Sequence, residues 1–297
     1  FTVNGGDEWI KLEGGMPTIS LRDITIQRRE NDVVAASFGR GFFILDDYTP
    51  LRELSDAVLD EEATLFKPRD GYWYVPKNAV RYMGDDYYSA PNPDFGVTFS
   101  YYLKENVESK KAERQKAEKA LGDADIPFPG WEALEDEMRE KAASLHIEIF
   151  NGEGKMVQRV PAKLSKGFHR VSWDLSMANQ GMVDADYPNR GSRRGFMVQP
   201  GTFSAQLMRT VDGKSEPLGY KVTFEVKPLF ENPALDRKDD QEVMAFRQEV
   251  EDFANMLTKA SNHLEEGIKK AKAMQVALSR SRTPNPALMK EIHDLEM

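Results

Sequence analysis

The sequence predicts a mainly β fold with some helices, and three patterns along the chain carry this prediction. Residues 9–46 hold short apolar runs that are separated by turns. From residue 96 onward, several short segments alternate between apolar and polar side chains. From residue 236 onward, apolar residues recur at spacings of three and four. The first two patterns are typical of β-sheets, and the third is typical of a helix that packs on another helix.

The first region, residues 1–50, contains the apolar runs WIKL, ISLRDITI, DVVAASF and GFFILDD. Residues 28–32 predict a polar turn between two strands, and Gly39–Gly41 a tight link between the next two. Phe42–Leu45 is an unbroken apolar run, whereas a strand with one wet face would alternate. We therefore expect this strand to be covered on both faces, as in stacked sheets such as propeller blades.

The chain opens in a turn, because residues 2–9 read TVNGGDEW. An Asn-Gly-Gly-Asp turn that leads at once into Trp9 and Ile10 is typical of the second half of a hairpin. We therefore expect Phe1 to mark a cut made inside a larger fold.

Residues 51–95 are predicted to form a connector, because prolines and tyrosines are frequent in them. Within this connector, the stretch TLFKPRDGYWYV predicts either a strand or a packed extended segment.

Residues 96–229 show the clearest alternation, which predicts a β-sandwich. Asn151-Gly152 and Asp212-Gly213 are strong signals for hairpin turns between its strands. The side chains predicted to share a core face within each strand are Val97, Phe99, Tyr101 and Leu103; Leu145, Ile147 and Ile149; Val171, Trp173 and Leu175; Phe203, Ala205 and Leu207; Tyr220, Val222, Phe224 and Val226.

A helical hairpin is predicted to interrupt the sandwich at residues 104–144, which are rich in Lys, Glu and Ala. Its two helices would be joined by the segment GDADIPFPG, and Trp131, Leu134, Met138 and Ala142 stand at helical spacing in the second. This hairpin is either a solvated decoration or an arm that binds a partner.

The C-terminal region, residues 230–297, predicts a long helix over residues 236–280 and a second helix from Ala287 to Met297. Residues 283–286 read TPNP and break the helical pattern between the two. The apolar seam of the long helix either docks within the chain or forms a dimer. Its members are Phe246, Val250, Phe253, Leu257, Ala260, Leu264, Ile268, Ala271 and Leu278.

Composition excludes several classes of protein. The 297 residues carry a net charge of −9, which argues against nucleic acid or an anionic membrane as a partner. No apolar run reaches the roughly 18 residues of a transmembrane segment. The chain has no cysteine, so disulfides and thiolate metal sites are excluded, and a cytosol or a bacterial periplasm fits equally well.

Residues 2–9 resemble an Asp-box, whose pattern is Ser-x-Asp-x-Gly-x-Thr-Trp, and the positions that align are Thr2, Asn4, Gly6, Glu8 and Trp9. The segment from Trp9 to Leu54 resembles the last blade of bacterial BNR-repeat, sortilin-like β-propeller proteins, often called glycosyl hydrolases with BNR repeats. The matching features are Gly15-Met16-Pro17, Asn31-Asp32, Gly39-Arg40-Gly41 and Asp46-Asp47.

The resemblance extends beyond the blade. TLFKPRDGYWY is similar to the segment that leaves the last blade in that family. GFHRVSWDL and VQPGTFSAQL resemble its Ig-like module, which is similar to one in the flagellar hook-capping protein. The resemblance implies a remnant of a propeller blade, an Ig-like sandwich and a C-terminal helical hairpin. It also implies a secreted, periplasmic or cell-envelope location.

No residue is predicted to be catalytic, to bind a cofactor or to bind a metal. In the family, the Asp-box braces a turn, so Asn4 and Asp7 are not expected to catalyse. Asp46 and Asp47 end a strand, but adjacent strand residues point to opposite faces, so turn capping is the favoured interpretation. The four histidines show no i, i+4 pair that could hold a metal; they are His146, His169, His263 and His293.

A long polar segment from residue 179 to 202 separates two sandwich strands. It is either an uncommitted loop or a binding loop for a carbohydrate or an acidic peptide. The side chains that could bind such a ligand are Tyr187, Arg190, Arg193 and Arg194.

Two functions therefore remain open. The first is a non-catalytic interaction or assembly region of a propeller protein that binds a polypeptide or glycan. The second is an accessory region of a glycoside hydrolase whose catalytic residues lie in other blades. A homodimer could form through the C-terminal helix or through the exposed edge of the blade.

Overall fold

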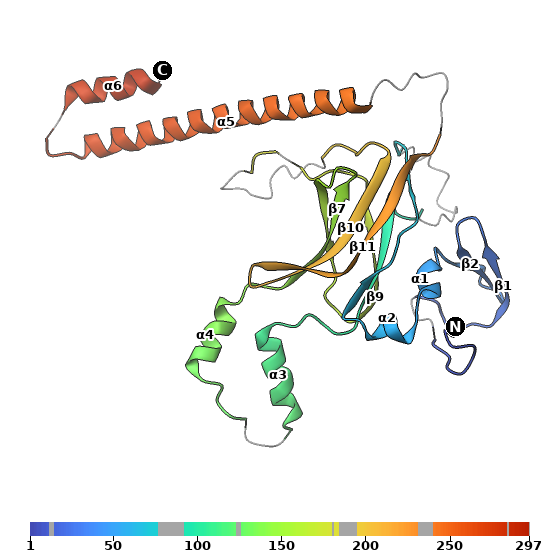
Figure 1. The fold of residues 1–297 in the computed structure, drawn as a ribbon. Helices are drawn as coiled ribbons and strands as arrows, with labels where there is room; N and C mark the ends of the chain where they lie inside the picture. The colour runs from blue at the N-terminus through green and yellow to red at the C-terminus, as the bar shows by residue number, and fades with distance from the viewer. Residues whose placement is uncertain are drawn as a thin grey trace. The chain divides into compact units, whose positions relative to one another are not determined.

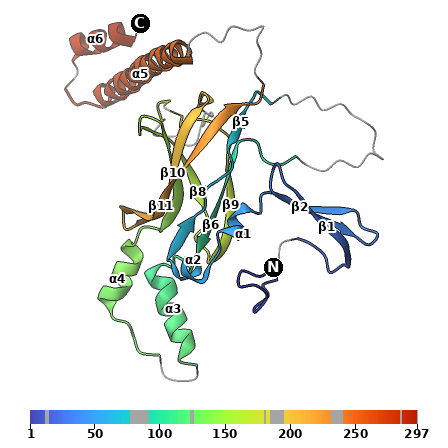
Figure 2. The ribbon, with the colours of Figure 1, turned by 45° about the vertical axis from the view of Figure 1, so that its right-hand side comes forward.

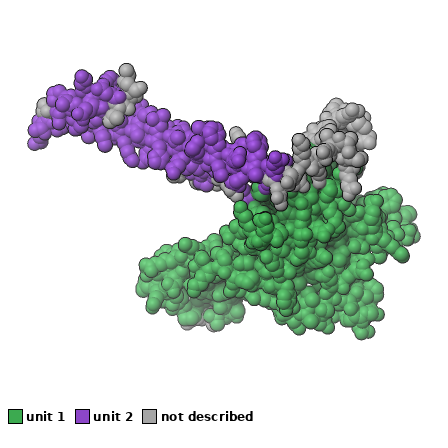
Figure 3. All heavy atoms as spheres, turned by 45° about the horizontal axis from the view of Figure 1, so that its top comes forward, with its two compact units in different colours: residues 1–177, 197–231 green, residues 178–196, 232–297 purple. Residues whose placement is uncertain are grey.

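The computed structural model describes residues 1–11, 15–76, 92–122, 126–179, 181–183, 195–230, 240–283 and 285–296. The fold is mainly β with some helices, as the sequence predicts (Figure 1). The chain divides into two compact units, residues 1–177 with 197–231 and residues 178–196 with 232–297 (Figure 3). This division is coarser than the four predicted regions, whose boundaries stay predictions.

The N-terminal sheet of the first unit is an antiparallel meander of three strands, β1 Leu21–Gln27, β2 Asp32–Ser37 and β3 Phe42–Leu45. The turns that join them lie at the predicted places, residues 28–31 and 38–41. Strand pairing sets Ala35 between Ile24 and Phe43 on one face, and Val34 beside Ile44 on the other. Both faces of this sheet are therefore apolar.

The prediction that Phe42–Leu45 is covered on both faces is wrong for the part of the chain that the structure describes. Phe42 is 74% exposed and Ile44 60% exposed. Ile24, which projects from the opposite face, is 59% exposed. The unbroken apolar run predicts burial, but β3 is an edge strand that pairs with β2 alone in its sheet.

The remaining strands of the first unit form two sheets. One has five strands in the order β5-β11-β10-β7-β8, and the other has three in the order β4-β6-β9 (Figure 2). Their bounds are β4 Ala63–Leu65, β5 Gly71–Trp73, β6 Val97–Leu103, β7 Ser144–Asn151, β8 Met156–Ala162, β9 Gly167–Trp173, β10 Gly201–Val211 and β11 Lys214–Pro228.

A single hydrophobic core contains residues of both sheets, and we call this pair of sheets the sandwich. Trp173 is 1% exposed, packs edge-on against Phe203 and Phe224, and donates its indole N–H to the Ser176 carbonyl at 2.8 Å. The alternating side chains of β6, β7 and β10 all enter this core, as their spacing predicts.

One residue that the sequence predicts to lie in the core, Tyr220, lies on the surface instead. Tyr220 is 76% exposed, and Leu218 occupies the core instead at 5% exposure. The register between β10 and β11 shifts between Ala205 and Leu207, which face Val222 and Leu218. Gly219 lies in this bulge at a φ of +64°, which suits glycine. The bulge therefore turns Tyr220 away from the core.

The predicted connector supplies one edge strand to each sheet of the sandwich. Strand β4 pairs antiparallel with β6, and β5 pairs parallel with β11. Two short helices, α1 Thr49–Arg52 and α2 Asp56–Asp60, precede these strands. The chain thus passes directly from the N-terminal sheet into the sandwich.

The insertion forms two helices, α3 Lys110–Ala120 and α4 Trp131–Arg139, which lie side by side in both ribbon views (Figures 1 and 2). Arg114 donates to both Glu137 carboxylate oxygens, at 2.5 and 3.0 Å. The sequence pattern places Ala142 in α4, but this residue lies beyond the end of the helix. Glu140 leaves the helix, and its carboxylate accepts from the Lys110 amide at 3.0 Å.

The second unit contains the long helix α5 Asp240–Ser279 and the short helix α6 Pro286–Glu296. Asn285 caps α6 by accepting the Leu288 amide at 3.2 Å, and Pro286 takes the first helical position. Among the described residues, no helix combines the length and the apolar character that crossing a membrane requires.

Candidate functional site

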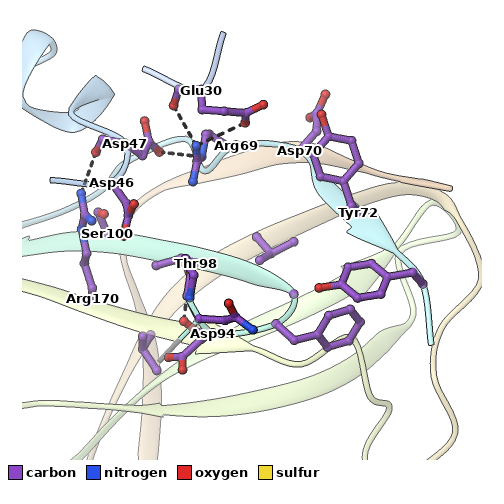
Figure 4. A pocket seen from close by; sticks show the side chains of 18 residues that line it. Glu30, Asp46, Asp47, Arg69, Asp70, Tyr72, Asp94, Thr98, Ser100 and Arg170 are labelled. Atoms are coloured by element: carbon purple, nitrogen blue, oxygen red, sulfur yellow. Dashed lines mark hydrogen bonds and ion pairs between the residues drawn. The ribbon is translucent and has the colours of Figure 1, made fainter. Parts of the chain in front are cut away.

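A pocket of about 640 Å³ lies between the N-terminal sheet and the sandwich (Figure 4). The strand ends and turns of the N-terminal sheet supply acidic groups, and strands β5, β6 and β9 supply aromatic and hydroxyl groups. Side chains that line it include Glu30, Asp46, Asp47, Arg69, Asp70, Tyr72, Tyr74, Asp94, Phe95, Thr98, Ser100 and Arg170.

Arg69 is the centre of the polar network on one wall of the pocket. Its guanidinium donates to the Glu30 carbonyl at 2.7 Å and lies 3.4 Å from the Asp32 carboxylate and 3.8 Å from that of Asp47. These carboxylates are mostly buried, with 19% of the Asp32 side chain and 13% of the Asp47 side chain exposed. One cation on the sandwich side therefore attracts several carboxylates at the acidic end of the N-terminal sheet and offsets part of their charge.

Both the backbone and the carboxylate of Asp47 form hydrogen bonds that fix its position. It has a φ of +44°, its amide donates to Asp32 at 2.9 Å, and its carboxylate accepts from the Thr49 amide at 3.2 Å. Arg170, on β9, donates to the Asp47 carbonyl at 2.6 Å. Asp47 thus caps the turn after β3, which agrees with the favoured interpretation of the sequence.

A smaller cavity of about 340 Å³ adjoins this network and includes Glu53 and Lys67 in its lining. Burial and, after it, the nearby Asp47 carboxylate raise the pKa of Glu53.

Asp70 lies at the other end of the pocket. Its carboxylate accepts from Lys227 at 2.7 Å and from the Glu225 amide at 3.1 Å. Burial acts against ionisation of this group, but the hydrogen bonds from Lys227 and Glu225 prevail and lower its pKa. Asp70 therefore fastens β5 to β11 in its charged form.

The remaining lining is suited to holding a polar ligand with an apolar face. Tyr72 is 46% exposed, and Tyr74 meets Phe95 edge-on with ring centroids 4.8 Å apart. Asp46 lines the same pocket outside the contacts of Arg69 (Figure 4). Aromatic rings beside a carboxylate are a combination that can bind sugars or peptides.

Asn4, at the Asp-box position, braces the N-terminal turn. Its side-chain oxygen accepts from the Glu8 amide at 3.0 Å and from the Thr2 hydroxyl at 2.9 Å. Phe1 and Ile10 exchange two backbone hydrogen bonds at 2.7 and 2.8 Å, which closes the loop that contains this turn. Asp7 is exposed in the same turn.

The residues that line the pocket include no histidine. His146 is 13% exposed on β7, with its Nε2 atom 3.4 Å from Glu148. His169 lies against the ring of Tyr101 at 5.2 Å and its Nε2 atom is 2.5 Å from the Ser165 carbonyl. His263 and His293 lie on α5 and α6. Over the described ranges, no three His, Asp or Glu side chains are grouped as ligands for a metal.

The central part of the predicted binding loop lies outside the residues that the structure describes. Tyr187, Arg190, Arg193 and Arg194 lie outside the described residues. At the two ends of the loop, the Met182 amide donates to Asn255 at 3.2 Å, and Arg247 lies over the ring of Phe196 at 5.4 Å.

Sequence reasoning missed Arg69 and Arg170, which organise the pocket. Arg69 stands between two three-residue strands, and Arg170 alternates out of β9 as a surface residue would. The motif that did carry a signal was Asp46-Asp47 at the end of a strand. Its partners come from elements 22 and 123 residues away in sequence, so local spacing could not identify them.

No protein-family model and no curated protein matches the sequence. Among solved structures, the crystal structure of FLGD from P. aeruginosa is similar to part of the chain, with 17% identity and a TM-score of 0.19. The match covers 27% of this chain and 50% of the FLGD chain. This weak, partial likeness does not assign the chain to a family.

Proposed function

We propose that this chain is a non-catalytic interaction and assembly region of a secreted or cell-envelope propeller protein of the BNR-repeat, sortilin-like kind. In this proposal, β1–β3 is part of the last propeller blade. The sandwich is its Ig-like neighbour, and the pocket between them takes a polypeptide or a glycan.

The exposed apolar faces of the N-terminal sheet carry this proposal. Ile24 and Ile26 are 59% and 46% exposed on one face, and Phe42 and Ile44 are 74% and 60% exposed on the other. A soluble sheet that works alone keeps at least one polar face. A propeller blade has two apolar faces because it packs between neighbours. The sheet is therefore built for assembly with other sheets.

The network in the pocket supports a binding role over catalysis. Arg69 and the capping contacts already occupy the carboxylates of Asp32 and Asp47, so they serve as structural anions. Glycosidases need two carboxyl groups about 5–10 Å apart across the sugar bond, one of which must give up a proton. Asp46, Asp94 and Tyr72 also line the pocket, and in this proposal they serve recognition.

Turnover and binding of a panel of aryl glycosides, polysaccharides and peptides would test this proposal. We expect no turnover, and binding that Tyr72→Ala weakens about tenfold or more. Tyr220→Ala, which removes an exposed tyrosine outside the pocket, is the matched control and should bind normally. Turnover that Asp46→Asn abolishes, or binding that Tyr72→Ala leaves unchanged, would reject the proposal.

A second candidate function is an accessory region of a glycoside hydrolase. The observation that favours it is the acidic and aromatic lining contributed by Asp46, Asp94, Tyr72 and Tyr74. A hydrolase assembled from this chain and additional blades would cleave a glycoside that this chain only binds. Activity in the longer protein, with none in this chain, would favour this second candidate over the first.

A further inference from the structure

Helix α5 carries a continuous apolar seam with a heptad repeat. Its members alternate at spacings of four and three over five heptads, which is the pattern of a coiled coil. They are Phe246, Val250, Phe253, Leu257, Ala260, Leu264, Gly267, Ala271, Met274 and Leu278. Phe246 is 66% exposed, Phe253 57% and Leu264 67%. We call these ten residues the α5 seam.

Helix α6 packs on α5, where two members of the α5 seam, Ala271 and Leu278, are half-buried, while the other eight members stay exposed. Ile292 of α6 is 4% exposed, and the α5 side chains that become half-buried near it include Ile268, Ala271 and Leu278. Met274, in the same stretch, remains 55% exposed. A helix of this length gains most of its stability from packing its apolar face, so the open seam indicates a missing partner helix.

The seam is asymmetric in charge. Around its first half, acidic side chains outnumber basic ones, with Glu242, Glu249, Glu251 and Asp252 against Arg247 and Lys259. Around its second half the balance reverses, with Lys269, Lys270 and Lys272, and Arg280 and Arg282 just beyond the helix, against Glu265 and Glu266. Two such helices side by side attract each other only when they run in opposite directions.

Side-chain size also differs between the two halves of the seam. Its first half holds two phenylalanines, Phe246 and Phe253, and its second half holds Gly267 and Ala271. Gly267 leaves open space, since nothing lies within 4 Å of the position that a Cβ would take. An antiparallel arrangement brings the large side chains of one helix over the small ones of the other, which a parallel arrangement cannot do.

We propose that the α5 seam binds the α5 seam of a second copy of this chain, antiparallel, so that each acidic half lies along the basic half of its partner. This proposal rests on α5 alone and stands apart from the proposed function. Helix α6 would flank the pair on the side that it already covers.

The mass of the full chain across a concentration series, by light scattering or sedimentation, is the first test. We expect a dimer that Leu257→Asp converts to a monomer, whereas Asn262→Asp, on the outer side of α5, leaves it intact. Circular dichroism would verify that both variants keep the sandwich. A monomer at all concentrations, or a dimer that Leu257→Asp does not affect, would overturn the proposal.

Spin labels decide the direction, because the chain has no cysteine of its own. At a rise of about 1.5 Å per residue, Glu242→Cys labels in an antiparallel pair lie roughly 50 Å apart, whereas Thr258→Cys labels lie within about 20 Å. A parallel pair would give a short distance at both positions and would overturn the antiparallel arrangement. Glu249→Lys should weaken the dimer about fivefold, and Lys270→Glu in the same chain should restore it.

Discussion

The sandwich and the N-terminal sheet are both antiparallel and both rich in apolar side chains, yet they differ in what covers them. Phe99 and Ile147 in the sandwich are fully buried, whereas Phe42 and Ile44 in the N-terminal sheet are mostly exposed. The difference shows that an apolar pattern predicts that a strand should be covered, whereas its burial depends on what packs against it. In the sandwich, other strands of this chain provide that cover.

The two regions also differ in how they are held. The sandwich is held by one contiguous apolar core. The N-terminal sheet is held to the sandwich by polar contacts, chiefly those of Arg69 and Arg170 with the turn after β3. Stability should therefore respond to apolar substitutions in the first region and to charge substitutions at the junction. Four experiments test this difference between the two regions.

The largest effect should come from the sandwich core. Trp173→Ala removes a fully buried ring that contacts Phe203 and Phe224, so we expect the free energy of unfolding to fall by about 3–5 kcal/mol. Phe42→Ser, in the N-terminal sheet, should change it by less than about 0.5 kcal/mol. Urea unfolding followed by circular dichroism would measure both. Equal losses would contradict the contrast between the regions.

Two glycines, one in each region, allow the stability cost of a Gly→Ala substitution to be compared between the sandwich and the N-terminal sheet. Gly96, beside β6, has a φ of +112°, and a Cβ there would lie 1.8 Å from the Trp173 carbonyl oxygen. Gly96→Ala should therefore cost about 3 kcal/mol of stability. Gly41, in the N-terminal sheet, has a φ of +78° with open space around it, so Gly41→Ala should cost only about 1 kcal/mol. Thermal unfolding of the two variants would rank them.

At the junction, Arg69→Met should loosen the N-terminal sheet without unfolding the sandwich. The substitution leaves the mostly buried carboxylates of Asp32 and Asp47 without their cation, which should cost about 1–2 kcal/mol. Arg29→Met removes an arginine of the turn between β1 and β2 whose side chain is 82% exposed, and it should cost almost nothing. Hydrogen exchange of residues 21–45 would separate the two. Unchanged protection in Arg69→Met would contradict the role of this side chain.

The smallest effect should appear at low pH. The folded-state pKa of Asp70 is lowered, so its contribution to stability is present above the pKa of the unfolded chain and is lost as the pH falls below about 4. Asp70→Asn should lower stability slightly at pH 7 and flatten the acid limb of the pH–stability curve. Asp7→Asn, in the exposed N-terminal turn, should leave that limb unchanged. Parallel acid limbs in all three proteins would reject this role.

The sequence predicted the parts of the fold in which local pattern and tertiary environment agree. Val97, Phe99 and Tyr101 alternate because β6 has one face in the core, and both the pattern and the burial follow from that. The start of α6 follows from Asn285 and Pro286, whose capping roles are local. These are short-range effects, and short-range patterns capture them.

The parts that the sequence left open depend on contacts between distant residues. Strands β4 and β5 have three residues each, too few for periodicity, and exist because β6 and β11 pair with them. The alternation along β11 predicts that Tyr220 lies in the core, but the bulge at Gly219 turns its side chain away from the core. The pocket was invisible for the same reason, since Arg69 belongs to it only after the sheet and the sandwich meet.

The pairing of β5 with β11 sets an order of events during synthesis. The hydrogen bond from the Glu225 amide to Asp70 joins residues 155 positions apart. At about 5–20 residues per second, a ribosome needs on the order of ten seconds or more to supply the second partner after the first. For that time, Gly71–Trp73 has no strand to pair with, and the larger sheet lacks this edge. The chain therefore emerges with its N-terminal sheet complete long before the sandwich can close, and a chaperone that holds this segment would act within that interval.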